Sequence, residues 1–386
     1  MRILRVITRM NIGGPARQVS FLHDALNRDT DIEHRLVYGQ LDKDEGDFSN
    51  LIQNHEGVTF LKSLVRPISI GKDIKAFCSL VKIILDFKPD IIHTHTAKAG
   101  LLTRCAGIFV NTLNGLSFKK KIILMHTYHG HVFSGYFSPL KNKVFRALER
   151  ILWGFTDKLL VLTESQQKEI TSLLNVNPVK TAIVPLGLDL EKYLSIERTD
   201  YFNQRFSVEL KQWVGWIGRL ASIKNPLRFI DMIESYLSES KNLDVGFVLV
   251  GDGSEKQFVL DRISESPFKS QIFYYGWSDD LIKIYSGLDA FVNTSDNEGT
   301  PVAVLEAMSV GIPVLASDVG GTCDVLQSVL NSKVFNIENW EKDVSLNFRE
   351  ILNSERSSIK DRKKIVETFS RARLKKDLKL LYQKFS

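Results

Sequence analysis

Residues 293–313 decide the fold, and they read Asn-Thr-Ser-Asp-Asn-Glu-Gly-Thr-Pro-Val-Ala-Val-Leu-Glu-Ala-Met-Ser-Val-Gly-Ile-Pro. A short apolar run at 290–293 leads into this stretch, as a buried strand would. A helical pattern then begins near Pro301, and Gly311 returns the chain to another apolar run. The order of strand, turn, helix and strand predicts one unit of a parallel α/β sheet.

Two carboxylates eight residues apart, Glu298 and Glu306, belong to this unit. We place Glu298 in the loop at the carboxyl end of the strand, and Glu306 two turns along the helix. Pro301 suits the first helical position, and the free N–H groups of Gly299 and Thr300 would then point out of the helix start. Such a start favours an anion or a hydroxyl group. The alternative is that Glu298 only complements the helix dipole and Glu306 is a surface or capping carboxylate.

A second glycine turn favours the ligand site over that alternative. Residues 318–321 read Asp-Val-Gly-Gly, and they end the strand that follows the helix. Open α/β sheets bind ligands at turns of this kind, outside the carboxyl ends of adjacent parallel strands. The two turns together therefore predict a binding site in this half of the chain.

The rest of the chain repeats this architecture, because short β-rich runs alternate with helical stretches in two series. The expected strands are 3–8, 35–38, 91–94, 121–127 and 158–162 in the first series, and 213–217, 245–250, 271–274, 290–293 and 313–316 in the second. A chain of 386 residues also exceeds the ~250–300 residues at which a single core usually stops growing. We therefore predict two α/β domains.

The connection between the two series falls at 183–189, which contains turn-forming proline and glycine. This places an N-terminal Rossmann-like domain at 1–187 and a C-terminal Rossmann-like domain at 188–369. A basic helix is expected from about 359 to 385, with its apolar residues at helical spacing. Its end, about 370–386, would pack back onto the N-terminal domain.

Further motifs extend the pattern through most of the second half. Residues 215–220 read Gly-Trp-Ile-Gly-Arg-Leu, 224–226 read Lys-Asn-Pro, and 250–253 read Val-Gly-Asp-Gly. In order and spacing, these motifs and the Glu-x7-Glu segment resemble the retaining glycosyltransferases of the GT-B fold, in the large family 4 group. The resemblance implies two Rossmann-like domains whose parallel sheets face each other across a cleft that binds a nucleotide-sugar.

The resemblance also assigns roles to individual residues. It implies donor binding by Gly13, Gly14, Gly218, Arg219, Lys224, Gly299, Thr300, Pro301 and Glu306, and catalytic roles for His129, Arg219, Lys224 and Glu298. Arg219 and Lys224 suit the leaving diphosphate because two cations stabilise its developing charge, although either residue alone would be an ordinary surface cation. Glu306 suits the ribose hydroxyls because a carboxylate accepts two hydrogen bonds at once, and Glu298 would face the transferred sugar.

The first half offers a weaker match. Gly13 and Gly14 follow the first strand and precede a helical pattern at 18–26, so backbone could approach a diphosphate or an acceptor there. Pro15 and Arg17 make this turn an imperfect copy of the family motif. A Gly-Gly pair by itself occurs in many nucleotide-binding folds.

Histidines gather at two strand ends of the first half, with His93 and His95 at one, and His126, His129 and His131 at the next. No acidic or cysteine ligands accompany them at metal spacing, so we expect no metal and no cofactor. The resemblance places His129 near the transferred sugar, with His131 as the competing assignment. His93, His95 and His131 are the candidates for the acceptor side, and His126 is expected in the core.

The net charge of +6 is uneven, since residues 1–190 hold 25 Lys and Arg against 17 Asp and Glu. Basic residues cluster at 119–121 and 141–150, a patch that suits either an anionic membrane surface or a solvated face. The pairs Asp29/Asp31 and Asp42/Asp44 lie in hydrophilic loop sequence and are expected to be solvated. With three scattered cysteines and no signal-peptide core, we expect a cytoplasmic protein, with the inner membrane face as an alternative site. No nucleic-acid motif accompanies the charge.

The resemblance thus predicts a retaining glycosyltransferase without a metal. It would move a sugar from a UDP- or GDP-donor to a glycan or polyprenyl-linked saccharide, in surface polysaccharide synthesis. Two alternatives stay open, a nucleotide-sugar epimerase of related fold and a nucleotide-sugar-binding subunit without catalysis. The sugar and the acceptor depend on loop shape, which the sequence does not give.

Overall fold

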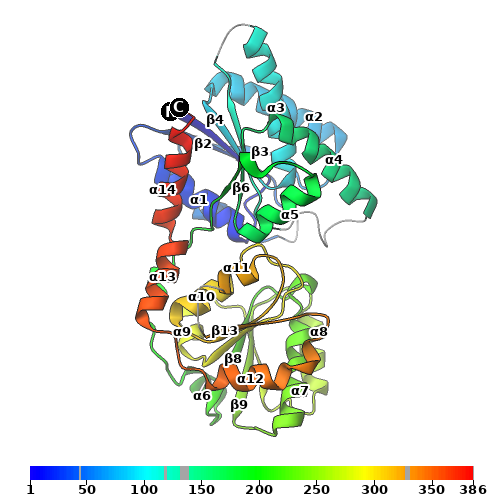
Figure 1. Ribbon diagram of the computed structural model, residues 1–386, viewed down its shortest axis with the longest axis vertical. Coiled ribbons are helices and arrows are strands. Elements are labelled where there is room, and N and C mark those ends of the chain that lie inside the picture. Colours follow the sequence, from blue (N-terminus) through cyan, green and yellow to red (C-terminus); the bar gives the residue numbers. More distant parts are fainter. Residues whose placement is uncertain (43–44, 117–119, 131–138, 327–330, 386) are drawn as a thin grey trace. The chain divides into compact units, whose positions relative to one another are not determined.

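The chain divides into two compact units (Figure 1). The N-terminal unit comprises Met1–Leu188 and Arg371–Ser386, and the C-terminal unit comprises Asp189–Ser370. Each unit is an α/β fold around one parallel sheet, which confirms the expected fold class. The computed structural model describes residues 1–42, 45–116, 120–130, 139–326 and 331–385, with 139–142 described by their backbone alone.

Seven parallel strands form the sheet of the N-terminal unit. In chain order they are β1 (Arg2–Ile7), β2 (Glu33–Gly39), β3 (Val58–Leu61), β4 (Ile91–His95), β5 (Ile123–Thr127), β6 (Lys158–Val161) and β7 (Thr181–Ile183). Their spatial order is β3-β2-β1-β4-β5-β6-β7, so the strand order reverses between β1 and β4. Every residue of β4 is buried, as expected for a central parallel strand that is covered on both faces.

Helices cover both faces of this sheet. They are α1 (Gly14–Leu26), α2 (Ile70–Phe87), α3 (Ala97–Leu116), α4 (Pro139–Phe155), α5 (Glu164–Leu174) and α14 (Arg371–Gln383), with short 3₁₀ helices η1 (Ser49–Leu51) and η2 (Pro178–Lys180). On one face, α2 and α3 pack against Leu4 of β1. On the other face, α1 and α14 pack against Ile3. Consecutive strand residues point to opposite faces, so Arg5 lies on the face covered by α1 and α14.

The C-terminal unit repeats this plan with six parallel strands. The strands are β8 (Gln212–Ile217), β9 (Val245–Val250), β10 (Ile272–Gly276), β11 (Ala290–Asn293), β12 (Val314–Ser317) and β13 (Ser332–Phe335). The helices are α6 (Tyr201–Phe206), α7 (Pro226–Ser240), α8 (Lys256–Glu265), α9 (Leu281–Ser286), α10 (Val302–Val310), α11 (Thr322–Leu326), α12 (Val344–Asn353) and α13 (Ile359–Phe369), with 3₁₀ helices η3 (Glu191–Tyr193), η4 (Ser222–Lys224) and η5 (Trp340–Lys342). The spatial order β10-β9-β8-β11-β12-β13 reverses between β8 and β11.

All ten strands expected from the sequence are present, with ends that agree within two residues. The sequence does not predict β3, β7 and β13, and each of these strands lies at an edge of its sheet. β3 has no buried residue, and β13 has one. An edge strand has one strand neighbour and more solvent contact, so it lacks the continuous apolar run that identifies a central parallel strand.

Helix α14 belongs to the N-terminal unit, beside α1 (Figure 1). Leu374 and Leu378 are buried there, and Lys375 Nζ pairs with Asp29 Oδ1 at 2.7 Å. Asp29 is therefore tied to a helix, and the expectation that it is merely solvated is wrong. The single helix expected from 359 to 385 is in fact two, because Ser370 adopts an extended conformation between α13 and α14.

A buried ion pair fastens α3 to α4. Arg104 donates to both carboxylate oxygens of Glu149, each at 2.7 Å, and both side chains are almost fully buried. Tyr128, just after β5, also donates to Glu149 at 2.6 Å. Within the part of the chain that the structure describes, no helix is long and apolar enough to cross a membrane.

Candidate functional site

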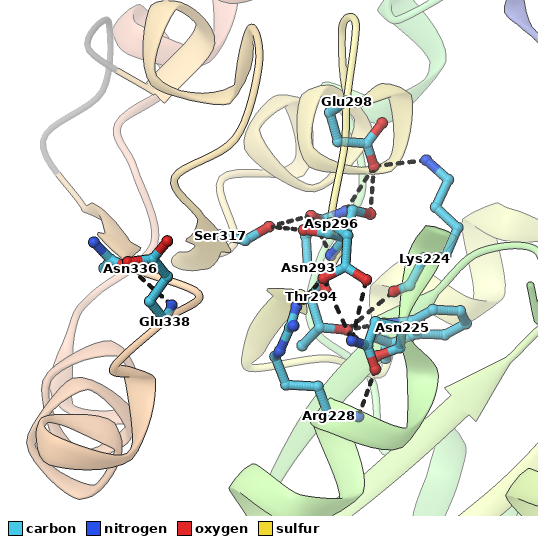
Figure 2. A network of polar contacts seen from close by, with 12 residues as sticks. Lys224, Asn225, Arg228, Asn293, Thr294, Asp296, Glu298, Ser317, Asn336 and Glu338 are labelled. Atoms are coloured by element: carbon cyan, nitrogen blue, oxygen red, sulfur yellow. Dashed lines mark hydrogen bonds and ion pairs between the residues drawn. The ribbon is translucent and has the colours of Figure 1, made fainter. Parts of the chain in front are cut away.

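The turns after β8 and β11 form the candidate site of the C-terminal unit. These strands are neighbours where the strand order reverses, which is where open α/β sheets bind ligands. Thr294 joins the two turns, because its hydroxyl donates to the Asn225 carbonyl oxygen at 2.8 Å and accepts from Trp216 Nε1 at 2.9 Å. Arg228 Nη1 also pairs with Asp296 Oδ1 at 2.7 Å. Figure 2 shows how this network holds the turns together.

Lys224 and Glu298 meet within the network. Lys224 Nζ lies 2.6 Å from Glu298 Oε1 (Figure 2). Ser295 Oγ and Asn293 Nδ2 donate to the same oxygen, at 2.6 and 3.2 Å. The Glu298 side chain is 6% exposed and that of Lys224 is 29% exposed. Three donors therefore fix the orientation of one buried carboxylate, and the lysine connects it to solvent.

Two tyrosines orient Glu306. Glu306 lies one turn into α10, instead of the expected two, and it is buried. Tyr193 donates its hydroxyl to Oε1 and Tyr285 donates to Oε2, both at 3.0 Å. Burial, and then the neighbouring Glu306, raise the pKa of Tyr285 well above its usual value, so its hydroxyl keeps its proton. Sequence reasoning missed both tyrosines, because 113 and 21 residues separate them from Glu306 and no local pattern links them.

The start of α10 lies one residue later than expected. Gly299 and Thr300 occupy the turn, and Pro301 is the N-cap residue with an extended ψ of 99°, not the first helical residue. The hydroxyl oxygens of Thr300 and of Thr322, the first residue of α11, are buried and have no hydrogen-bond partner among the described residues. Buried polar groups without partners are rare, so a polar ligand at this edge would complete the hydrogen bonding of both.

Arg219 follows Gly218 in the turn after β8, and its side chain is exposed. Close packing fixes the backbone at this turn, because a Cβ on Gly251 would lie 1.8 Å from the Gly218 carbonyl oxygen. Gly251 also has a φ of 143°, which side chains rarely tolerate. The structure therefore brings Lys224 into contact with Glu298, while the Arg219 side chain forms no hydrogen bond or ion pair with the described residues.

The turn after β1 holds Gly13 and Gly14 in the N-terminal unit. Gly13 is the N-cap residue of α1 and Gly14 is its first residue. A Cβ on Gly13 would lie 3.7 Å from Pro15 Cδ, and one on Gly14 would lie 4.0 Å from Leu186 Cδ2. Both are ordinary contacts, so packing within this unit does not demand glycine at either position.

The carboxyl ends of β4 and β5 bring His95 beside His129. His95 Nδ1 lies 2.7 Å from His129 Nε2. His93 Nδ1 lies in hydrogen-bond contact with the Tyr382 hydroxyl oxygen, at 2.6 Å. Both His93 and His95 are fully buried. This burial argues against the expectation that His93 or His95 touches an acceptor, since neither side chain reaches the surface. His131 lies outside the described residues.

His129 is partly exposed, but burial of its ring nitrogens and the nearby charge of Arg5 lower its pKa to about 3. It is therefore a neutral imidazole at physiological pH. Its Nδ1 atom is buried and has no hydrogen-bond partner among the described residues. His126 is a core residue, as expected, and its Nδ1 lies 2.8 Å from Thr94 Oγ1.

A metal site does not emerge from these side chains. Among the described residues, no three His, Cys, Asp or Glu side chains come together in a group that could hold a metal ion. The polar groups at the carboxyl ends of the strands in the two units are instead cations, carboxylates, hydroxyls and neutral imidazoles. This set suits recognition of phosphate and hydroxyl oxygens by hydrogen bonds and charge.

Comparisons with known proteins cover nearly the whole chain. The family model described as Glycosyl transferases group 1 matches residues 197–368, and the model described as Glycosyltransferase Family 4 matches residues 12–192. A protein of Escherichia coli, UDP-Gal:alpha-D-GlcNAc-diphosphoundecaprenol alpha-1,3-galactosyltransferase, is 30% identical over 282 residues. That alignment covers 72% of this chain and 70% of the relative.

Solved structures share the architecture of the whole chain. Anabaena Alr3699/HepE in complex with UDP superposes with a TM-score of 0.73 at 18% identity, and the match covers 100% of both chains. The lipopolysaccharide outer core galactosyltransferase WaaB superposes with a TM-score of 0.74 at 17% identity, again over 100% of both chains. At these identities the likeness establishes the fold.

Proposed function

This chain belongs to the GT-B glycosyltransferases, and from that premise we propose that it transfers a sugar from a UDP- or GDP-sugar to a lipid-linked saccharide with retention of anomeric configuration. One observation carries the proposal. At the strand reversal of the C-terminal unit, Lys224 and two buried carboxylates, Glu298 and Glu306, lie in a hydrogen-bonded frame. Such a frame suits a ligand that combines a diphosphate with hydroxyl groups.

The diphosphate would be bound by Lys224 and Arg219. The Lys224 ammonium has three N–H donors, of which one is directed at Glu298. Arg219 is exposed at the same strand end and has five donors. As the bond to the sugar breaks, negative charge grows on the leaving nucleoside diphosphate, and fixed cations stabilise that charge without reorganisation. The Thr300 hydroxyl and the N–H groups at the start of α10 would add neutral donors.

The nucleoside and the sugar would be bound by the two carboxylates. Glu306 would accept hydrogen bonds from the ribose hydroxyls, because Tyr193 and Tyr285 already fix the plane of its carboxylate. Glu298 would accept a hydrogen bond from a hydroxyl of the transferred sugar on Oε2, since its donors among the described residues all bind Oε1. In the N-terminal unit, Gly13, Gly14 and His129 are the residues we propose to contact substrate.

The reaction then needs no base from the protein. The acceptor hydroxyl oxygen would attack the anomeric carbon from the face of the leaving group. The bond between that carbon and the diphosphate oxygen breaks, and the hydroxyl proton passes to the departing diphosphate. The same-face attack retains the anomeric configuration. The residues named above bind and orient both substrates and stabilise the charge, and no step in this scheme assigns work to a metal.

We propose a lipid-linked acceptor by analogy with the Escherichia coli relative, whose name specifies a diphosphoundecaprenol-linked sugar. Helix α4 supports a membrane-bound acceptor, because it exposes apolar residues at helical spacing. These residues are Val144, Leu148, Ile151 and Phe155. Exposed basic side chains at Lys143 and Arg150 lie on the same helix. An amphipathic basic helix of this kind suits an anionic lipid surface, so we place the protein at the cytoplasmic face of the membrane.

The test of transfer uses purified protein, UDP- and GDP-sugars, and a polyprenyl-diphosphate-linked saccharide. A thermal-shift screen identifies the nucleotide, because a ligand that binds the folded state raises its apparent stability. NMR of the product then reports the anomeric configuration. Transfer with inversion would overturn the mechanism. An epimerised donor without transfer would indicate an isomerase, and donor binding without any product would indicate a binding subunit.

Liposome flotation tests the membrane surface. Anionic vesicles should carry the protein at low salt, and Ile151→Ser combined with Phe155→Ser should abolish flotation without changing donor hydrolysis. The matched control is Leu243→Ser, an exposed apolar residue of the C-terminal unit. Equal flotation of all three proteins, or none by the wild type, would refute the role of α4.

A further inference from the structure

Arg5, in the middle of β1, is fully buried, and no carboxylate pairs with it among the described residues. Its guanidinium instead binds His34 Nε2 at 3.0 Å, His95 Nε2 at 2.7 Å and the Tyr382 hydroxyl at 2.8 Å. An arginine side chain stays protonated in proteins and offers only donors. Each of these three atoms must therefore accept, and Arg5 becomes the origin of a set of directed hydrogen bonds.

The branch through His34 can be deduced independently from its far end. His23 Nε2 lies 3.0 Å from the Asn54 carbonyl oxygen, which can only accept, so His23 carries its proton on Nε2. His23 Nδ1 then accepts from His34 Nδ1 at 2.9 Å. This leaves His34 Nε2 as an acceptor, as Arg5 requires. Both ends of the branch give the same proton positions.

The branch through His95 leads to the edge that carries His129. Because His95 Nε2 accepts from Arg5, the proton of a neutral His95 must lie on Nδ1. It is donated to His129 Nε2 at 2.7 Å. His129 accepts on Nε2, so its own proton lies on Nδ1. That atom is buried and has no acceptor among the described residues, which is the condition that a bound ligand would relieve.

The ring charges agree with this assignment. Burial, together with nearby positive groups that include Arg5, lowers the pKa of His34 and His95 well below the usual range. The same causes lower the pKa of His129 to about 3. A protonated His129 would also direct an N–H of its own against the N–H of His95. The hydrogen bonds that run from Arg5 through His34 and through His95 therefore join neutral rings, and all of them donate in the direction away from Arg5.

We propose that Arg5 and His95 are positioning residues that set the tautomer of His129, so that His129 donates its Nδ1 proton to an oxygen of the sugar nucleotide. The inference rests on the proposed function and deepens it. A general base needs a lone pair on the nitrogen that faces the substrate, whereas this nitrogen carries the proton. His129 therefore serves as a hydrogen-bond donor to a sugar hydroxyl or to a diphosphate oxygen, both of which accept.

The decisive measurement is made on the wild-type protein, labelled with ¹⁵N in its histidine rings. Heteronuclear NMR that correlates ring nitrogens with ring protons should show His129 protonated on Nδ1, with no titration near the unperturbed pKa of ~6.5. The His129→Phe variant assigns the resonance. A proton on Nε2, or a titration near that pKa, would overturn the proposal whether or not the protein is active.

Ligand addition identifies the acceptor oxygen. A change in the Nδ1 resonance with UDP or GDP alone would indicate the diphosphate, and a change only with the intact nucleotide-sugar would indicate a sugar hydroxyl. Thermal shift in the same samples reports whether ligand is bound. Bound ligand without any change at His129 would refute the contact. If no nucleotide binds, the proposed function fails, while the tautomer result stands by itself.

Two substitutions of His95 separate positioning from packing. In His95→Asn the amide N–H₂ occupies the place of Nδ1, so the donor to His129 is kept. In His95→Gln the amide reaches the place of Nε2, so Arg5 keeps an acceptor while His129 loses its donor. We expect His95→Gln to lower kcat by about 10–100-fold with a smaller change in KM, as for other outer residues that orient a reactive group. His95→Asn should retain the His129 tautomer and most of kcat. Equal losses in both variants with the tautomer unchanged would reduce His95 to a structural role, and if neither folds, the wild-type spectrum still decides.

Discussion

The two units use one fold to build edges of different chemistry. The N-terminal unit contains all eight histidines of the chain, and the C-terminal unit contains none. In the first, neutral imidazoles carry hydrogen bonds outward from Arg5, so the arrangement fixes where protons lie. In the second, Lys224 binds Glu298 and two tyrosines bind Glu306, so the arrangement fixes where charges lie. The same fold can therefore fix the direction of hydrogen-bond donors in one unit and the position of charged groups in the other.

The largest expected effect is a loss of stability of the N-terminal unit in mild acid. Folding lowers the pKa of six histidines there, which are His23, His34, His93, His95, His126 and His129. The unfolded chain binds protons that the folded unit excludes, so stability is full above the unfolded pKa of ~6.5 and falls below it. Each histidine contributes up to about 1.4 kcal/mol per pH unit, and together they approach the 5–15 kcal/mol of a typical domain, about one to two pH units below that pKa.

Hydrogen exchange read by mass spectrometry, peptide by peptide, checks this difference. As the pH falls toward about 5, peptides of the N-terminal unit should lose protection first. Tryptophan fluorescence should change little, because four of the five tryptophans belong to the C-terminal unit. Simultaneous loss of protection in both units, or none until carboxylates titrate near ~4, would show that the histidines do not set the difference.

The next effect tests the charged edge. Lys224→Ala removes a cation from the leaving diphosphate, and we expect kcat to fall by about 10²–10³, the usual cost of one transition-state donor. Release of nucleoside diphosphate at saturating donor measures it. Lys211→Ala is the matched control, because Lys211 pairs with Asp244 in the same unit and its side chain is 80% exposed. Full activity of Lys224→Ala in a folded protein would remove Lys224 from the site.

A smaller effect is expected when Glu306 loses one of its orienting donors. Tyr285→Phe deletes a buried hydrogen bond, which typically costs about 1–3 kcal/mol, and calorimetry should show nucleoside diphosphate bound about tenfold more weakly. Tyr201→Phe is the control, since that hydroxyl pairs with Tyr275 at 2.6 Å instead. Identical affinities for both variants would mean that the tyrosines support the fold and not the binding of nucleotide.

The smallest stability effect is expected at the glycine turn. Gly14→Ala meets no close contact in the N-terminal unit, so urea unfolding should change by less than about 1 kcal/mol, toward greater stability. Turnover should nevertheless fall, because the added methyl group would occupy space that we assign to substrate. Unchanged kcat/KM would show that the glycine does not admit a ligand.

The sequence predicts most of the fold because central parallel strands are buried on both faces. β9 is apolar or glycine throughout and is identified to the residue. The edge strands β3, β7 and β13 are not predicted, because a partly exposed strand mixes polar with apolar residues and lacks a continuous apolar run. The break at Ser370 is not predicted either, since the apolar residues keep their helical spacing on both sides of it. The helices on either side of the break belong to different units, α13 to the C-terminal unit and α14 to the N-terminal unit, and the sequence does not show that division.

The candidate site is predictable only where its residues are close in the sequence. Glu298 and Glu306 share one segment, and Lys224 belongs to a recognisable turn. Tyr193 and Tyr285 reach Glu306 from other parts of the unit, so no local pattern reveals them. The sequence does contain a signal for Arg5. It is a charged residue between the apolar neighbours of a first strand, and such a residue is costly to bury without partners. Its partners, however, come from β2, β4 and α14, and only the fold assembles them.

Helix α14 imposes an order on events during synthesis. The C-terminal unit is continuous from Asp189 to Ser370, so all of its residues emerge from the ribosome before those of α14. The N-terminal unit begins first but waits for Leu374, Leu378 and Tyr382 to complete the layer over Ile3 and Arg5. In the nascent chain, the unit whose residues emerge first is therefore also the unit whose last residues emerge after the other unit is complete.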